Sequence, residues 1–460
     1  MDPVDPTQYG IIKFTQRGAA KFDDYEIFRY LHDQWYVYNG NALYHFNGCV
    51  YEQISEKVLI EVVYRVIDQL LAPFPGDKPL MTSAHMKDLV AQYRNTHQVR
   101  DIPVIASEDY ESSLGLVAFL NGVLNLDTFK FLPFTPYVFI PFQVQAMYNP
   151  ALKEHKVEKI YKNIIPCDAT REAFYRMAGY TIYSETIRFP AIFMLYGGGG
   201  TGKTSLQKAM TNLMPDYSYS SLTMVDMADK FALQVMEGKR ANFCGEADDR
   251  SSQETKISGA LLKDISEGGK PLVVQKKFGD HYAITPTAKP WFCTNSMPDF
   301  GDKTSGLYRR LIIVPCRVKQ NWDDMIQDAM AEPSAKDWFA NKCLEAYMEF
   351  LADGSTIEMS DDMKIELVSY MIQDNVMEFL MMEFGQVNDK KAIATQLEGQ
   401  STSEFFAKYE AYCHTQGARP LKSARFQERI RNEFDMVTKV KGIRLESGAT
   451  TSRTVYHVRE

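Results

Sequence analysis

The chain has 460 residues, of which 45% are hydrophobic and 12% aromatic, enough for large cores and, at roughly 150 residues each, about three domains. This composition excludes a disordered or fibrous chain. The 51 basic and 59 acidic side chains give a net charge of -8, so the chain lacks the overall basic character of many nucleic-acid-binding proteins, and any site for a polyanion must be local.

Cysteine spacing and the beginning of the sequence indicate the compartment. The seven cysteines include no Cys-x-x-Cys pair, which argues against a zinc ribbon or a disulfide framework. Met1 is followed by Asp-Pro-Val-Asp-Pro rather than by a signal peptide, and no stretch reaches the roughly 18 apolar residues that span a bilayer. We therefore expect a cytoplasmic protein with reduced thiols and no membrane partner.

The first 165 residues predict a small α+β region. Aromatic residues among Asn and Gly, followed by helical apolar spacing over 58–71, indicate a strand pair and a helix. Residues 119–127 alternate apolar side chains around an Asn-Gly turn, which is typical of a small hairpin. We expect this region, 1–165, to be an accessory or collar domain.

Residues 166–320 change to short apolar runs separated by polar helical segments, the pattern of a sheet covered by helices. The apolar run 191–196 leads into a glycine-rich loop and then a helix, the context that a Walker A phosphate-binding loop requires. The residues expected to bind the nucleotide are Gly197, Gly198, Gly199, Gly200, Thr201, Gly202, Lys203, Thr204 and Ser205.

Each part of this loop has a chemical reason. The glycines let successive backbone N–H groups turn toward phosphates, and the helix N-terminus adds partial positive charge. Lys203 is expected to reach the β- and γ-phosphates of ATP, and the Thr204 hydroxyl to ligate Mg²⁺. The sequence therefore predicts an α/β P-loop NTPase core with a parallel sheet.

Two later strands end in groups that hydrolysis needs. The strand 241–246 ends in Glu246, the candidate for a second Mg²⁺ ligand and for polarising the attacking water. Asp248 and Asp249 follow it, and surface acids of this kind are common on loops. The apolar run 290–295 ends in Asn295, which can hydrogen-bond the γ-phosphate or the water; a simple turn Asn is the alternative.

A predicted β-hairpin over 271–285 lies between these strands. Its tip is expected to carry Lys276, Lys277, Phe278 and His281. Cations and an aromatic ring at a loop tip suit a single-stranded nucleic-acid backbone, and a charged solvated turn is the other interpretation.

Arg309 and Arg310 immediately precede another apolar strand. An arginine at such an edge can reach the nucleotide of a neighbouring subunit and neutralise transition-state charge in trans, and an ordinary surface ion pair is the alternative.

The C-terminal part is predicted to be helical over 321–400, with a Met-rich face that we expect to pack into a core. The polar stretch 388–403 is interpreted as a linker. From Ala418 onward the sequence contains ten basic and five acidic side chains, and a predicted helix over 423–434 precedes two predicted strands. This pattern suits a winged-helix-like DNA-binding domain over 401–460; a merely solvated charged face remains open.

In this order and spacing the motifs resemble a superfamily 3 helicase of the phage, plasmid and poxvirus-type primase-helicase group. Besides the loop, Glu246, Asn295 and the basic hairpin, the resemblance includes Lys263 and the pair Gly268-Gly269. It covers roughly 25–384, and we expect no primase domain because only about twenty residues precede it.

The resemblance implies a homo-hexameric AAA+ ring that hydrolyses ATP with Mg²⁺ and moves 3′ to 5′ on single-stranded or forked DNA. It assigns Walker A to Lys203 and Thr204, the catalytic acid to Glu246, the polar sensor to Asn295 and the arginine finger to Arg310. Such a protein would serve phage or mobile-element DNA replication in a host cytoplasm, alongside a separate primase or polymerase. The alternatives are a replication initiator that uses ATP only as an assembly switch, and a non-replicative ATPase.

Overall fold

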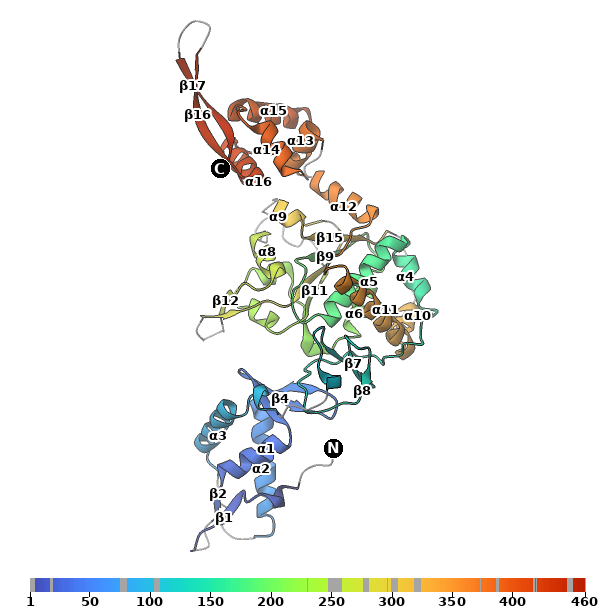
Figure 1. The fold of residues 1–460 in the computed structure, drawn as a ribbon, viewed down its shortest axis with the longest axis vertical. Helices are drawn as coiled ribbons and strands as arrows, with labels where there is room; N and C mark the ends of the chain where they lie inside the picture. The colour runs from blue at the N-terminus through green and yellow to red at the C-terminus, as the bar shows by residue number, and fades with distance from the viewer. Residues whose placement is uncertain are drawn as a thin grey trace. The chain divides into compact units, whose positions relative to one another are not determined.

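The structure, a computed structural model, forms two compact units. The N-terminal unit contains residues 1–154, 211–216 and 331–341, and the second unit contains 155–210, 217–330 and 342–460. Figure 1 follows the elements of each unit. The residues that the structure describes are 5–16, 20–74, 81–102, 108–229, 231–246, 259–275, 281–295, 297–298, 305–317, 324–372, 374–385, 389–416, 418, 420–444 and 450–459.

The N-terminal unit begins with helices around a small antiparallel sheet of order β3-β4-β5, where the sequence predicts a strand pair. The Asp23 carboxylate caps α1 by accepting hydrogen bonds from the first backbone N–H groups of that helix. The apolar spacing of α2 buries Leu59, Val63 and Ile67 in the core. The elements are β1 (Ile12–Phe14), β2 (Ala20–Phe22), α1 (Asp24–Asp33), β3 (Tyr36–Asn39), β4 (Ala42–Phe46), β5 (Tyr51–Ile54), α2 (Glu56–Leu71) and α3 (Ser83–Thr96).

A second antiparallel sheet of the same unit contains the expected Asn-Gly hairpin. Phe119 pairs with Gly122 across the turn, and a Cβ at Gly122 would lie 2.8 Å from the Leu132 carbonyl oxygen, so a side chain does not fit there. The strands are β6 (Leu116–Phe119), β7 (Gly122–Asn125) and β8 (Phe131–Leu132). The predicted hairpin is therefore confirmed.

The second unit is built on a five-stranded parallel sheet of order β10-β11-β14-β9-β15, which confirms the expected parallel sheet. All five strands point the same way, so their carboxyl ends share one edge. The elements are α4 (Glu158–Ile164), α5 (Asp168–Tyr183), β9 (Ile192–Tyr196), α6 (Lys203–Thr211), β10 (Tyr219–Ser220), α7 (Met224–Met227), β11 (Ala241–Glu246), α8 (Gly259–Glu267), β12 (Leu272–Gln275), β13 (His281–Ile284), β14 (Lys289–Thr294), α9 (Ser305–Tyr308), β15 (Leu311–Pro315), α10 (Asp324–Ala331) and the part of α11 (Pro333–Ala352) that follows residue 341.

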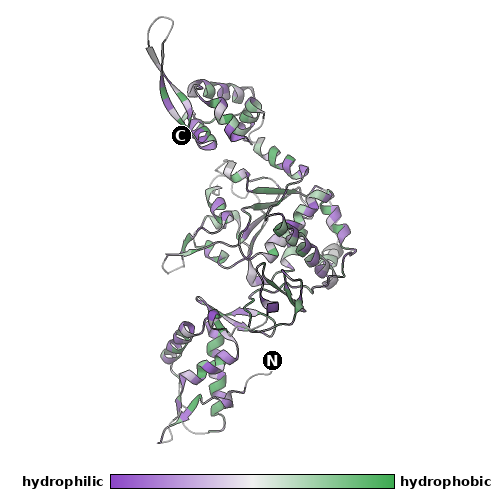
Figure 2. Cartoon of the chain, in the orientation of Figure 1, coloured by the Kyte–Doolittle hydropathy of each residue, from purple (hydrophilic) through white to green (hydrophobic). Residues whose placement is uncertain are grey.

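Both faces of this sheet are covered, as a parallel sheet requires. On one face the Trp291 ring lies 4.7 Å from the Phe193 ring, and its indole N–H donates to Thr181 of α5 at 2.9 Å. The alternate residues Met194 and Phe292 belong to the core cluster that includes α8. Figure 1 shows α5 and α8 on opposite sides of the sheet, and Figure 2 shows its strands among the most hydrophobic segments.

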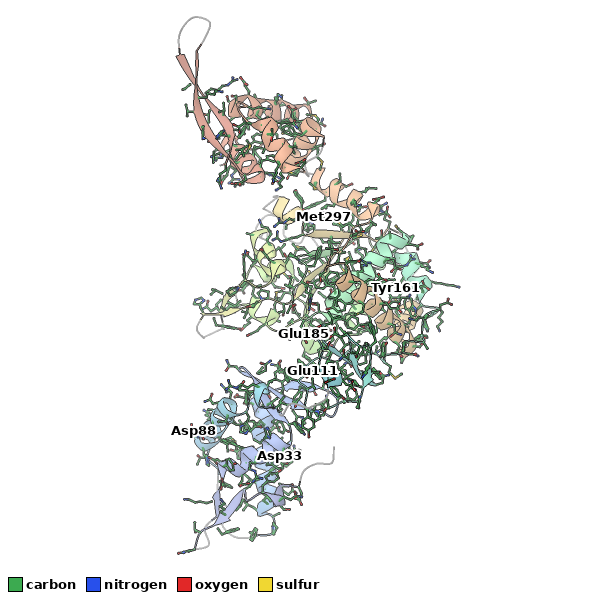
Figure 3. All side chains as sticks on the ribbon, viewed as in Figure 1. Asp33, Asp88, Glu111, Tyr161, Glu185 and Met297 are labelled. Atoms are coloured by element: carbon green, nitrogen blue, oxygen red, sulfur yellow. The ribbon has the colours of Figure 1, made fainter. Side chains whose placement is uncertain are left out.

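The helix α4 packs against α5 through tyrosines. Tyr161, labelled in Figure 3, is 1% exposed, and its ring lies 5.9 Å from that of Tyr175.

None of the helices within the described ranges is both long and apolar enough to cross a membrane.

The C-terminal part of the second unit ends in a helical cluster and a long hairpin. The predicted helix over 423–434 is confirmed, and the Met-rich face is buried at Met363 and Met377. The prediction of a linker over 388–403 is wrong, because 390–397 form a helix that buries Ile393 and Leu397. The elements are α12 (Asp361–Ile372), α13 (Asn375–Phe384), α14 (Lys390–Leu397), α15 (Thr402–Thr415), α16 (Ser423–Phe434), β16 (Met436–Arg444) and β17 (Thr450–Val458).

Candidate active site

The glycine-rich loop joins the carboxyl end of β9 to the start of α6. A Cβ at Gly197 would lie 1.9 Å from the Cys316 carbonyl oxygen, so only glycine fits beside the end of β15. Gly200 and Gly202 have φ angles of 76° and 88°, which glycine adopts without strain. The Thr201 hydroxyl donates to the Gly198 carbonyl at 2.9 Å and closes the loop on itself. A loop of this shape before a helix N-terminus is a cradle for phosphate groups.

The Lys203 ammonium group lies inside this loop and is 7% exposed. It donates to the carbonyl oxygens of Gly197 at 2.5 Å and Gly198 at 2.7 Å, and to the Asn295 side-chain oxygen at 2.7 Å. Two residues 92 positions apart, both predicted from the sequence, are thus in direct contact. All three of these acceptors are neutral oxygens, so within the part of the chain that the structure describes the lysine charge is solvated without being paired to a carboxylate.

The next two residues of α6 differ in exposure. Thr204 is exposed, whereas Ser205 is 6% exposed and packs within the second unit. Of the two hydroxyls, that of Thr204 is therefore accessible to a cation bound between phosphates.

Glu246 ends β11 at the same edge of the sheet. Its Cα is paired with that of Cys293 on β14, after an irregularity between Cys244 and Glu246. Asn295 directly follows β14, which lies between β11 and β9. The backbone thus brings the three strand ends together, while the Glu246 side chain, Asp248 and Asp249 lie outside the described residues.

Arg310 is held inside its own chain. Its side chain is 6% exposed, donates to the Gly306 carbonyl at 2.7 Å and pairs with the Glu267 carboxylate at 3.3 Å. Burial, followed by the adjacent charge of Arg309, lowers the pKa of Arg310 below its ordinary value. Arg309, in contrast, is exposed. Of the two adjacent arginines, Arg310 is therefore buried and Arg309 is exposed.

A buried ion pair that sequence reasoning did not predict anchors Tyr308, the residue before Arg309. The Tyr308 hydroxyl donates to one oxygen of Asp374 at 3.2 Å, and the Arg429 guanidinium donates to the other at 3.0 Å. The Asp374 side chain is 3% exposed. Asp374, which caps α13, thus contacts Tyr308, 66 positions before it, and Arg429 of α16, 55 positions after it. No local sequence motif encodes contacts over such separations.

The predicted hairpin is present as the antiparallel pair β12–β13. His281 is exposed and pairs with Gln275 at the end of the ladder. Lys276, Lys277 and Phe278 lie outside the described residues, so their role stays a prediction.

In the C-terminal hairpin, β16 and β17 carry cations on neighbouring strands. Lys441 pairs with Arg453 across the ladder, and Val440 beside them is 71% exposed. Like charges opposite each other destabilise a strand pair, but Arg453 also pairs with the Glu404 carboxylate, which offsets part of this repulsion. A polyanion beside this hairpin would meet the exposed Lys441 side chain.

Two segments match known families. Residues 25–169 match the family described as D5 N terminal like, and residues 195–310 match a family of unknown function, DUF5906. No curated protein matches the chain.

Solved structures of the NrS-1 C-terminal region show a loose similarity. One apo structure of this region (305–718), in its A form, has 14% identity and a TM-score of 0.48 over 95% of this chain and 100% of its own. Another apo structure of the same region has 13% identity and a TM-score of 0.43 over 76% of this chain and 99% of its own. This similarity is too weak to support an assignment. The two matched families themselves are typical of phage and plasmid primase-helicase proteins.

Proposed function

We propose that the chain is an ATP- and Mg²⁺-dependent DNA helicase with an AAA+ core, which assembles as a homo-hexameric ring in the replication of a phage or another mobile element. The observation that supports this most directly is the Lys203 ammonium group, held by two loop carbonyls and Asn295 at the shared edge of the parallel sheet. Phosphate oxygens of ATP would replace these neutral acceptors and form charge-assisted hydrogen bonds with the lysine.

In this proposal the chain's own residues divide the work of hydrolysis. Lys203 stabilises charge on the transferred phosphoryl group, and Asn295, released from the lysine, hydrogen-bonds the attacking water. Glu246 accepts the proton of that water. An arginine of the Arg309-Arg310 pair neutralises transition-state charge in the neighbouring subunit, and the exposed position of Arg309 favours it for this contact.

The residues at this edge fit a magnesium ion. Thr204 offers an exposed hydroxyl at the start of α6, and Glu246 ends the strand on the other side of β14. Oxygen donors of this kind are the ligands that Mg²⁺ prefers, and the ion would neutralise charge on the β- and γ-phosphates.

DNA engagement in the proposal depends on the β12–β13 hairpin and the basic C-terminus. Lys276, Lys277 and Phe278, with His281, would contact the backbone and bases of one strand, moving 3′ to 5′ as the resemblance implies. The winged-helix-like segment of α16, β16 and β17 would bind the fork or the origin, with a separate primase or polymerase completing replication.

The test is ATP hydrolysis by the purified chain with and without single-stranded DNA, for the wild type, Lys203→Ala and Lys208→Ala. Lys208 is an exposed cation on the same helix, so its removal controls for lost charge. We expect DNA-stimulated turnover that Lys203→Ala reduces at least about 100-fold and Lys208→Ala leaves unchanged. Wild-type turnover in Lys203→Ala would contradict the nucleotide site.

A second candidate is a replication initiator that uses ATP only as an assembly switch. The paired cations of the C-terminal hairpin favour it, because they suit duplex DNA without requiring unwinding. Origin binding and ATP-dependent assembly without strand displacement would support this candidate over the helicase.

A further inference from the structure

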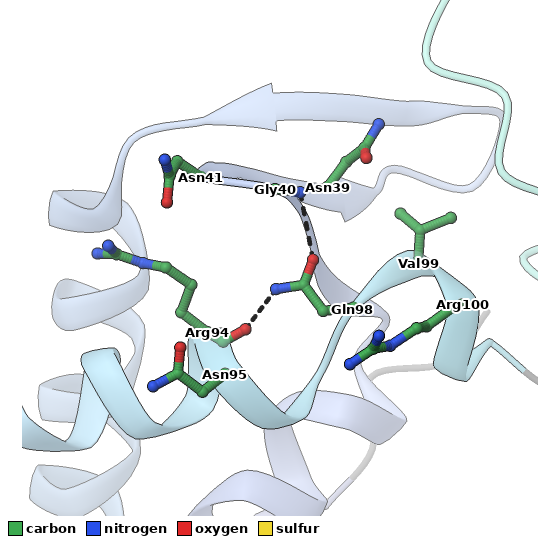
Figure 4. Close-up of a pocket in the computed structure, with 8 residues that line it drawn as sticks. All are labelled: Asn39, Gly40, Asn41, Arg94, Asn95, Gln98, Val99 and Arg100. Atoms are coloured by element: carbon green, nitrogen blue, oxygen red, sulfur yellow. Dashed lines mark hydrogen bonds between the residues drawn. The ribbon is translucent and has the colours of Figure 1, made fainter. Parts of the chain in front are cut away.

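A polar pocket lies in the N-terminal unit, built only from residues that the proposed function does not use. Its volume is about 510 Å³, and it lies between the turn joining β3 to β4 and the C-terminal end of α3 (Figure 4). Most of its lining is carboxamide and guanidinium groups, from Asn39, Asn41, Arg94, Asn95, Gln98 and Arg100.

Hydrogen bonds hold the two walls together. The Gln98 side-chain oxygen accepts from the Gly40 backbone N–H at 3.2 Å, and its amide donates to the Arg94 carbonyl oxygen. The Tyr38 backbone N–H also donates to the His97 carbonyl at 2.9 Å. Gly40 has a φ of 60°, which the tight turn requires. The pocket is therefore shaped before any ligand enters.

Arg94 is fixed but not buried. Its guanidinium pairs with Glu56 and lies 5.6 Å from the centre of the Tyr38 ring, while the Tyr38 hydroxyl donates to the same carboxylate at 3.0 Å. The side chain keeps 34% of its surface exposed. A guanidinium held in place at a pocket wall loses little conformational freedom when it binds an oxyanion.

The lining selects the chemistry of the ligand. The lining contains two arginines and no carboxylate, and the Glu56 carboxylate that offsets part of the Arg94 charge lies outside it. The lining itself therefore favours an anion, and guanidinium groups bind phosphate oxygens in a planar fork. Carboxamides donate and accept hydrogen bonds at once, as the edges of nucleobases do. A volume near 510 Å³ lies in the range of small-molecule sites. A phosphate linked to a planar, polar group such as a nucleobase thus fits this pocket better than an apolar ligand does.

We propose that this pocket binds one nucleotide of single-stranded DNA, with its two flanking phosphates on Arg94 and Arg100, which lie on either side of Gln98 in Figure 4, and the base edge against the carboxamides. The pocket chemistry accounts for a nucleotide, and the choice of single-stranded DNA as the polymer rests on the proposed function. The N-terminal unit then carries a DNA contact of its own, separate from the hairpin Lys276 and Lys277.

The experiment is a fluorescence-anisotropy titration of a labelled single strand with the full chain, without ATP, over a series of salt concentrations. Arg100→Gln and Arg94→Gln are compared with Arg65→Gln, which removes the same charge from an exposed position on α2 outside the pocket. We expect each pocket variant to weaken binding several-fold and to lower the salt slope by about 0.7. Arg65→Gln should match the wild type, and thermal unfolding should show that all variants are folded.

The outcomes separate this inference from the proposed function. If the wild type binds the strand but Arg100→Gln and Arg94→Gln behave like Arg65→Gln, the pocket assignment is wrong and the helicase proposal stands. If the wild type binds no single strand, both are wrong. If polyglutamate, or a free deoxynucleoside monophosphate, displaces the strand as well as unlabelled DNA does, the DNA polymer is not the occupant.

Discussion

Lys203 and Arg310 are both buried cations of the second unit, but their partners differ. Lys203 is bound by neutral oxygens of Gly197, Gly198 and Asn295, whereas Arg310 pairs with the Glu267 carboxylate. A carboxylate offsets part of the field of a cation, while carbonyl dipoles stabilise the cation and leave its charge available to an anion. In the proposed function this difference suits Lys203 to binding a phosphate and Arg310 to holding its own segment.

The largest effect that would test this comparison is expected for Arg309→Ala. If the exposed arginine serves a neighbouring subunit, its removal should lower the ATP turnover rate about 1,000-fold and leave ATP affinity close to that of the wild type. Rings mixed from Arg309→Ala and Lys203→Ala subunits should regain some activity, because each supplies what the other lacks. No recovery in mixed rings would contradict a contact in trans.

Asn295→Asp would make Lys203 resemble Arg310. The new carboxylate, in the position of the amide oxygen that now accepts at 2.7 Å, would cancel the lysine charge before ATP arrives. We expect ATP affinity to fall about tenfold, or about 1.4 kcal/mol, as measured by calorimetry. Asn295→Ala, which removes an acceptor without adding charge, is the matched control and should keep the affinity. Equal affinity in Asn295→Asp and the wild type would argue against the neutral-acceptor account.

Arg310→Gln should act on stability more than on nucleotide binding. It breaks the pair with Glu267, which also binds Lys270 at 3.2 Å and keeps 37% of its side-chain surface exposed. Because water can reach this carboxylate, we expect the free energy of unfolding to fall by only about 2 kcal/mol, measured with denaturant. A variant as stable as the wild type but without turnover would return the finger role to Arg310.

Lys289 is a third buried cation and gives the smallest expected effect. Lys289 begins β14, and its ammonium group donates a hydrogen bond to the Ser184 carbonyl. Burial holds the pKa of Lys289 well below the ordinary value of 10.5. The unfolded chain therefore binds more protons, and this residue makes stability rise with pH up to about 10.5. Lys289→Met should raise the free energy of unfolding at neutral pH by about 1 kcal/mol and flatten that rise. An unchanged pH profile would contradict a depressed pKa.

Local sequence was sufficient where neighbouring residues determine the conformation. The loop from Gly197 to Thr204 follows from its glycines, the helix over 423–434 from its apolar spacing, and the parallel sheet from the alternation of apolar runs with helical segments. The linker prediction over 388–403 rested on polar composition, whereas the helix over 390–397 buries only a narrow stripe of apolar side chains that includes Ile393 and Leu397.

Contacts between distant residues were not predictable in the same way. The Lys203–Asn295 bond joins residues 92 positions apart, and the Glu267 carboxylate that holds Arg310 belongs to a different helix. The Asp374 site combines Tyr308 and Arg429 from two other elements. Such pairs depend on strand order and helix packing, so a single sequence offers no spacing that reveals them.

The central claim is most directly tested by strand displacement. A labelled strand annealed to a template with a 3′ or a 5′ single-stranded tail is incubated with the chain, ATP and Mg²⁺, with Lys203→Ala as the inactive control. The account predicts ATP-dependent release from the 3′-tailed duplex and none with Lys203→Ala. ATP turnover without release from either duplex would contradict the helicase and favour the initiator.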